Sequence, residues 1–458
     1  MSRISHSALA LFVAAASFAS ASAFGQATTS APPPAVAAPK PTAAVPSPRG
    51  PQLIVQLDHA EAIYRVGETA TFTFRLTENG KPLDEGAVTW ITSKDGVPPL
   101  GKGQVKLKNG SASITAKLDE PGFLQCRATF DTAAKKSIVA LAGAAFDPLQ
   151  IKPSLPVPDD FDSFWAAQKA ALAALPINAR LTPVQSPSKT LEAYDLQADC
   201  VGAPVSGYFA KPIGAKAKSL PIILLVHGAG VRSSALGAAC SFAATGKGML
   251  AMDINAHGIP NGKPDAYYTD LANGSLKDYR SVGRESRETC YFLGMFLRLV
   301  RAIDFLTAQP EWDGRTVIVH GSSQGGAQSL VAAGLDSRVT FFAAGVPAMC
   351  DHSGIVAGRV NGWPKLVPID AKTMKPDANV LQVARYFDAM NFVTRTKAPG
   401  IVSVGFIDGT CPPSSVYAAY NNIPTAKQII NDPASGHTVT PKAGTAMRAA
   451  IIAHVERK

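Results

Sequence analysis

The sequence predicts two folded parts: a small all-β sandwich of immunoglobulin-like type, and after it a larger α/β domain with a mostly parallel sheet covered by helices on both faces. Three observations lead to this prediction. With 458 residues, the chain is too long for one ordinary domain. Between about residues 52 and 146, apolar residues alternate with a period of two. Beyond Pro148, near-continuous apolar runs alternate with helical stretches, which is typical of a buried parallel sheet.

The first 23 residues have the layout of a signal peptide. Arg3 precedes an apolar run, and small residues follow at positions 21–23. The run is too short and too rich in Ala and Ser for a membrane span. We therefore expect residues 1–23 to be removed and the mature chain, secreted or periplasmic, to begin near Phe24. Residues 24–50 are rich in Pro and Ala and predict an extended linker.

Residues 51–147 form the predicted sandwich. Short strand candidates are separated by turn signals such as Glu78-Asn79-Gly80, and about seven strands in such a length are typical of immunoglobulin-like sandwiches. No cluster of catalytic side chains falls in this part, so a spacer, a docking surface and a carbohydrate contact are its alternative roles. The candidate strands are "LIVQLD", "TATFTFRL", "AVTWITS", "QVKLK", "SASITAKL" and "FLQCRATF".

Residues 148–458 form the predicted α/β domain. Its strands read as Val/Ile/Leu-rich runs, and the helical segments between them imply parallel crossover connections. The predicted strands are 221–228, 248–254, 316–321, 340–348, 400–408 and 426–432, and the clearest helices are 159–175 and 290–306.

Charge and cysteine content narrow the functional class. The formal charge is +10, or +9 without Arg3, but no block of five or six basic residues occurs. A spread of this kind predicts a solvated basic surface and argues against a nucleic-acid groove. Six cysteines show no metal-ligand spacing, so we expect neither a metal nor another cofactor. Export permits disulfides, but the sequence does not fix their pairing.

The stretch "VIVHGSSQGGAQSL", residues 317–330, fits the pattern G-x-S-x-G at a predicted corner between strand and helix. One interpretation is a tight turn. The other is a nucleophile, Ser323, held on a strained backbone between glycines two positions away on each side. A helix that begins near Gln324 would then direct its N–H groups at developing negative charge.

An acid and a histidine follow in the order that a catalytic triad of this geometry requires. Asp408 ends the predicted strand 400–408, and His437 lies in the loop after the last predicted strand. In this interpretation His437 takes the proton of Ser323, and Asp408 orients and polarises the histidine. Asp351, which also follows a strand, is the alternative acid.

A partner for the negative charge of the transition state is expected in the early loop His227-Gly228-Ala229-Gly230. There the backbone N–H of Ala229 could act with that of Gln324 as an oxyanion hole. A structural role is expected for His227, because His437 already fills the place of the general base.

From about Pro156 to Lys458, these segments resemble the acetyl xylan esterase and cephalosporin C deacetylase family of carbohydrate esterases, which have the α/β-hydrolase fold. The resemblance implies Ser323 as nucleophile, Asp408 as acid, His437 as base, and the backbones of Gln324 and Ala229 as oxyanion donors. The matching motifs are "DDFDSFW", "HGAG", "YFLGMFLRLVRAIDFLTAQPEWDGRTVIVHGSSQGG", "VPAMCD", "DGTCPPSSVYAAYN" and "GH".

The sequence departs from the family pattern at three places. "DINAHGIPNG" (253–262) stands where Arg-Gly-Gln is usual, Thr438 stands where Glu usually follows the histidine, and Ala229 replaces a common aromatic residue. The catalytic set is therefore expected to be intact, while the pocket around it differs from the family pattern.

The resemblance implies a secreted serine carboxylesterase that removes acetyl groups from carbohydrate, such as acetylated xylan or oligosaccharides, through an acyl-enzyme. An exported peptidase or lipase and a catalytically inactive carbohydrate-binding relative are the alternatives. No lid segment of a lipase is evident. The family forms rings of several subunits, which implies a homo-oligomer, whereas the added sandwich could block or redirect such an assembly.

Overall fold

The computed structural model describes residues 50–83, 86–95 and 99–457. The predicted signal peptide (1–23) and residues 24–49 of the predicted linker lie outside this part. Contacts place the described residues in one compact unit that spans 48–458, so the predicted limit near residue 147 stays a prediction. Within the described residues, no helix is long and apolar enough to cross a membrane.

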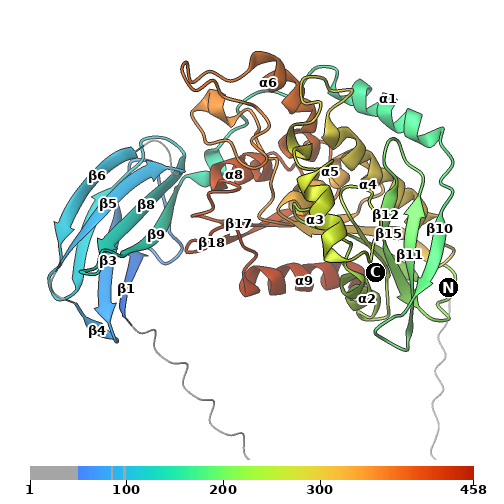
Figure 1. The fold of residues 1–458 in the computed structure, drawn as a ribbon, viewed down its shortest axis with the longest axis horizontal. Coiled ribbons are helices and arrows are strands. Elements are labelled where there is room, and N and C mark those ends of the chain that lie inside the picture. Colours follow the sequence, from blue (N-terminus) through green and yellow to red (C-terminus); the bar gives the residue numbers. More distant parts are fainter. Residues whose placement is uncertain (1–49, 84–85, 96–98, 458) are drawn as a thin grey trace, which may run out of the picture. The chain divides into compact units, whose positions relative to one another are not determined.

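The amino-terminal all-β sandwich is confirmed and has two sheets (Figure 1). Alternation is clearest in β3, where Ala70, Phe72, Phe74 and Leu76 are all buried. Strand β9, which contains four alanines and a glycine, is missing from the predicted set. Among the described residues, one sheet contains β1 (Pro51–Leu57), β3 (Ala70–Glu78), β4 (Lys81–Pro82) and β7 (Ser111–Ala116), and the other contains, in order, β2 (Ile63–Tyr64), β9 (Ser137–Phe146), β8 (Gly122–Asp131), β5 (Ala87–Lys94) and β6 (Pro99–Lys106).

The following part contains a sheet of nine strands within the described residues, and its α/β fold is confirmed. The six neighbouring strands β14, β13, β15, β16, β17 and β18 run parallel to one another. Strands β10, β11 and β12 add an antiparallel edge that was not predicted. In spatial order the strands are β10 (Arg180–Val184), β11 (Leu191–Ala198), β12 (Val205–Pro212), β14 (Leu250–Ile254), β13 (Leu220–Val226), β15 (Trp312–Ser322), β16 (Phe341–Gly345), β17 (Gly400–Gly405) and β18 (Lys427–Asp432).

Two predicted strands end three residues earlier than expected. β16 ends at Gly345 instead of residue 348, because the next residue, Val346, has a positive φ angle of 36° that extended strands do not adopt. β17 ends at Gly405, so Asp408 lies in the loop three residues beyond the strand.

Helices cover both faces of this sheet (Figure 1). Successive residues of the fully buried β13 face opposite sides: Ile222 and Leu224 pack into the core beneath one layer of helices, and Ile223 and Leu225 into the core beneath the other. The first layer includes α1 (Phe161–Ala173), α4 (Tyr291–Thr307), α5 (Gln324–Leu335), α7 (Ala389–Val393) and α8 (Pro413–Asn421), and the second includes α2 (Leu236–Ala243) and α9 (Pro441–Glu456). Shorter connections contain α3 (Asp265–Asn273) and α6 (Ala378–Ala384).

Candidate active site

Ser323 stands between β15 and α5 in a strained conformation, with φ 59° and ψ −121°. The two glycines of the motif allow this corner to lie against β13. A Cβ at Gly321 or at Gly325 would fall 2.1 Å from the carbonyl oxygen of Val226. The backbone N–H of Ser323 donates to the carbonyl of Gly345 at 2.8 Å, which fixes the corner against the next strand. The motif therefore forms a tight turn that presents Ser323 at the corner, and the role of Ser323 as nucleophile stays a prediction.

His437 lies between the predicted nucleophile and the predicted acid. Its Nε2 is 2.8 Å from Ser323 Oγ, and its Nδ1 is 2.8 Å from Asp408 Oδ2. A carboxylate only accepts, so Nδ1 carries the proton and donates to Asp408. Nε2 is then free to accept from the serine hydroxyl, which is the arrangement of a general base.

Asp408 is held by its own loop. Its Oδ1 accepts from the backbone N–H groups of Thr410 at 2.8 Å and Cys411 at 2.9 Å, and its side chain is 1% exposed. With one oxygen fixed by two backbone donors, the other is directed at His437. The sequence suggested the acid, but not these donors, because backbone contacts leave no side-chain signal.

Asp351, the alternative acid, lies in a different environment. Its Oδ1 accepts from the backbone N–H of Ser154 at 3.2 Å and from the hydroxyl of the same residue, and Arg359 Nη1 lies 3.1 Å from Oδ2. The structure therefore brings Asp408, and not Asp351, next to His437.

The loop after β13 packs against the serine, since a Cβ at Gly228 would fall 3.5 Å from Ser323 Cβ. The Gly228 carbonyl accepts from Arg232 Nη2 at 3.3 Å and lies 2.8 Å from His227 Nδ1. The carbonyl and the N–H of one trans peptide point in opposite directions. The N–H of Ala229 shares its peptide with the Gly228 carbonyl, so it is directed away from Arg232 and His227. The N–H of Gln324 is available as well, because α5 begins at this residue.

A buried aromatic group behind this loop was not predicted. Tyr279 donates its hydroxyl hydrogen to Gln324 Oε1 at 2.9 Å, and its ring packs against His257 at 4.7 Å between centroids. His257 Nε2 lies 3.3 Å from the Gly230 carbonyl and Nδ1 lies 2.7 Å from the Tyr291 hydroxyl. Burial lowers the pKa of His257 to about 4, so the ring is neutral: it donates from Nε2 and accepts at Nδ1. "DINAHG" is thus one of the segments that contact the loop after β13.

Asp408, Cys411 and His437 have ligand atoms within 4.8 Å of one another, which raises the question of a metal site. Burial raises the pKa of the Cys411 thiol well above its usual range, so the sulfur is protonated near neutral pH. Both nitrogens of His437 already have partners. The contacts of His437 with Asp408 and Ser323, and of the Cys411 N–H with Asp408, account for this grouping. All six cysteines of the chain, each within the described residues, are unpaired.

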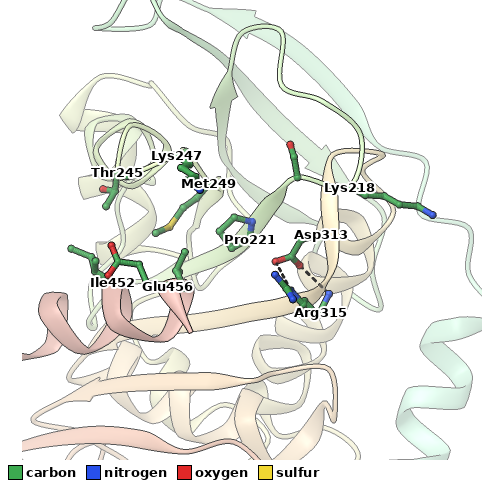
Figure 2. A pocket seen from close by; sticks show the side chains of 13 residues that line it. Lys218, Pro221, Thr245, Lys247, Met249, Asp313, Arg315, Ile452 and Glu456 are labelled. Atoms are coloured by element: carbon green, nitrogen blue, oxygen red, sulfur yellow. Dashed lines mark hydrogen bonds and ion pairs between the residues drawn. The ribbon is translucent and has the colours of Figure 1, made fainter. Parts of the chain in front are cut away.

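A cavity of about 580 Å³ lies at the amino-terminal ends of the central strands β13 and β15 (Figure 2). Its wall includes Lys218 and Pro221 at the start of β13, and Asp313 and Arg315 at the start of β15. Ser323 follows the other end of β15. A strand of seven residues such as β13 spans about 20 Å, so this cavity is separated from the triad by the length of the sheet.

Comparisons with known proteins place these residues in context. The family model for acetyl xylan esterase (AXE1) matches residues 146–450. Acetyl esterase Axe7A of Xylanibacter ruminicola is 32% identical over 395 residues, which cover 84% of this chain and 86% of that protein. The structure of an acetyl xylan esterase from Paenibacillus sp. R4 is 29% identical with a TM-score of 0.58, and covers 67% of this chain and 98% of that one.

The structure of acetyl xylan esterase 1 from Thermoanaerobacterium sp. JW/SL YS485 shares the fold, with 23% identity and a TM-score of 0.53 over 67% of this chain and 97% of that one. Each of the two solved structures thus covers a share of this chain that is about as long as residues 148–458. The match with Axe7A covers 84% of the chain and must extend beyond the α/β part.

Proposed function

Because this chain belongs to the acetyl xylan esterase family, we propose that it hydrolyses acetyl esters of carbohydrates through an acyl-enzyme formed on Ser323. The chain is a carboxylic ester hydrolase with the α/β-hydrolase fold.

In the first step, His437 Nε2 takes the proton of Ser323 Oγ as this oxygen attacks the carbonyl carbon of the ester. The new oxyanion accepts from the N–H groups of Ala229 and Gln324. Collapse of this intermediate breaks the bond to the sugar oxygen, which leaves with the proton from His437. Water then attacks the acetyl-serine with the same base, and acetate and free Ser323 are formed.

One observation carries this assignment: a single imidazole lies 2.8 Å from both a strained serine hydroxyl and a buried carboxylate. The carboxylate stabilises the imidazolium that forms when the serine loses its proton, since an opposite charge in contact favours the charged form. Intact geometry of this kind also argues against an inactive carbohydrate-binding relative.

Acetylated xylan or oligosaccharides are the proposed substrates, because the names of the relatives record activity on acetyl esters and acetyl xylan. Polymers of this kind lie outside the cell. The proposed signal peptide at residues 1–23 is consistent with export to them.

The test compares the wild type with Ser323→Ala and with Ser337→Ala, an exposed serine that serves as control. We expect Ser323→Ala to lose acetate release from acetylated xylan and hydrolysis of 4-nitrophenyl acetate by at least about 1,000-fold, and Ser337→Ala to keep both. Unchanged rates in Ser323→Ala would refute the mechanism. A preference for long-chain esters or for peptides would instead favour a lipase or a peptidase.

A further inference from the structure

The loop that carries Asp408 is in direct contact with the amino-terminal sandwich. Gln125, on β8, donates from Nε2 to the carbonyl oxygen of Phe406 at 3.2 Å. The Gln125 side chain is nearly inaccessible and Phe406 is fully buried. This contact reaches the chain two residues before Asp408.

Aromatic packing reinforces the same point of contact. The ring of Phe123, also on β8, lies 5.0 Å from that of Phe406 and 5.4 Å from that of Tyr417 on α8. Strand β9 approaches closely as well, since a Cβ at Gly143 would fall 2.5 Å from the carbonyl oxygen of Phe406. Glycine at position 143 is therefore required for the sandwich to reach the loop.

A second polar contact lies on the other side of Asp408. Ser414, at the start of α8, donates its hydroxyl hydrogen to the carboxyl group of Asp95, which follows β5. Both side chains are buried. The sandwich thus holds the chain two residues before and six residues after Asp408.

The α/β part alone leaves the Phe406 carbonyl without its donor. The N–H groups of Phe406 and Ile407 donate to the carbonyls of Asp432 and Ser435, each at 3.2 Å, in the segment that leads to His437. The carbonyl of Phe406 points the other way, to Gln125. A buried carbonyl without a partner is unfavourable, so removal of this donor favours movement of the loop.

We infer that the sandwich acts as a positioning element of the catalytic site, with Gln125 as a positioning residue that acts on Asp408 through Phe406. The inference rests on the proposed role of Asp408 and goes beyond it, because it assigns part of the catalytic rate to a β sandwich that contributes no atom to the triad. The match with Axe7A, which extends beyond the α/β part, is consistent with such a role.

The experiment uses the full-length protein with Gln125→Met, which keeps the length of the side chain and removes the donor. Gln104→Met, on exposed β6, is the matched control. We expect Gln125→Met to lower kcat for 4-nitrophenyl acetate by about 10-fold with little change in KM, since small misplacement of a catalytic group is enough for such a loss. The acidic limb of the pH profile of kcat/KM should move to lower pH, because a displaced carboxylate favours the imidazolium less.

A double-mutant cycle separates positioning from general loosening of the structure. In an Asp408→Asn background, Gln125→Met should have no further effect on the residual kcat, because the group that it positions is already lost. Equal fold-losses in both backgrounds, or an unshifted pH profile, would overturn the inference. If Asp408→Asn itself kept full activity, the proposed triad would fail instead, so the two failures are distinguishable.

Ser414→Ala supplies a second variant in case Gln125→Met does not yield folded protein. It removes the contact on the other side of Asp408 and is expected to shift the pH profile in the same direction. A folded Ser414→Ala protein with the kcat and pH profile of the wild type would contradict the role assigned to the sandwich.

Discussion

Asp408→Asn is the most informative single substitution, because the structure determines how the new amide would be oriented. The two N–H groups of Thr410 and Cys411 require an acceptor at the position of Oδ1. The amide oxygen of asparagine fills that position, so its NH₂ group faces His437 Nδ1. Two donors then oppose each other unless the imidazole changes its tautomer.

The other tautomer cannot act as a base toward the serine. With Nδ1 as acceptor, Nε2 carries the proton and donates to Ser323 Oγ, instead of taking its hydrogen. The reverse orientation of the amide would set its NH₂ group against the backbone N–H donors of Thr410 and Cys411. We therefore expect kcat to fall by about three to four orders of magnitude, which corresponds to about 4–5.5 kcal/mol of transition-state stabilisation.

The assay is steady-state hydrolysis of 4-nitrophenyl acetate, with circular dichroism to verify that the variant is folded. The comparison is Asp351→Asn, which changes the alternative acid. The kcat of this variant per folded molecule should stay within about tenfold of the wild type, because the partners of Asp351 are Ser154 and Arg359 and not His437. The reasoning is refuted if Asp408→Asn loses less than about tenfold, or if Asp351→Asn loses as much as Asp408→Asn.

Three further outcomes can be checked. Tyr279→Phe leaves the Gln324 side chain without its hydroxyl partner and should lower kcat about three- to tenfold in steady-state assays; an unchanged kcat would show that the amide needs no support. Gly325→Ala places a Cβ 2.1 Å from a β13 carbonyl and should abolish soluble expression, whereas Gly237→Ala, with open space in α2, should change the free energy of unfolding by less than about 1 kcal/mol in urea titrations; similar behaviour of the two variants would contradict this. Burial raises the pKa of Asp95 to about 6, so its contribution to stability is present below pH ~4 and is lost as the pH rises through about 6. Asp95→Asn should therefore raise the free energy of unfolding at pH 8 by up to about 3 kcal/mol and change it little at pH 4, and equal effects at both pH values would contradict this assignment.

Local chemistry explains which features could be predicted from the sequence. The corner at Ser323 requires glycine at two fixed positions, and near-continuous apolar residues identify a strand such as β13. These requirements are visible within about ten residues of chain. The α/β fold and the candidate residues therefore follow from short patterns.

Features that depend on distant parts of the chain could not be predicted in this way. Strand β10 is short, mostly exposed and contains a proline, so its residues do not indicate a strand, and only its pairing with β11 makes it one. The contact of Gln125 with Phe406 has no local pattern on either side, because a buried glutamine on a strand has the same sequence signature as an exposed one. Tyr279 likewise lies in a short turn with no recognisable motif.

The contact of Gln125 with Phe406 also bears on how the enzyme matures. These residues are 281 positions apart, and the strand that carries the glutamine is made long before the segment that it holds. Contacts between such distant residues form late, because closing a long loop is entropically unfavourable. During synthesis, the loop that carries Asp408 can be fixed against an ordered sandwich only after the carboxyl-terminal quarter of the chain has been made. Esterase activity would therefore be one of the last properties that the folding chain acquires, and a stringent measure of completed folding.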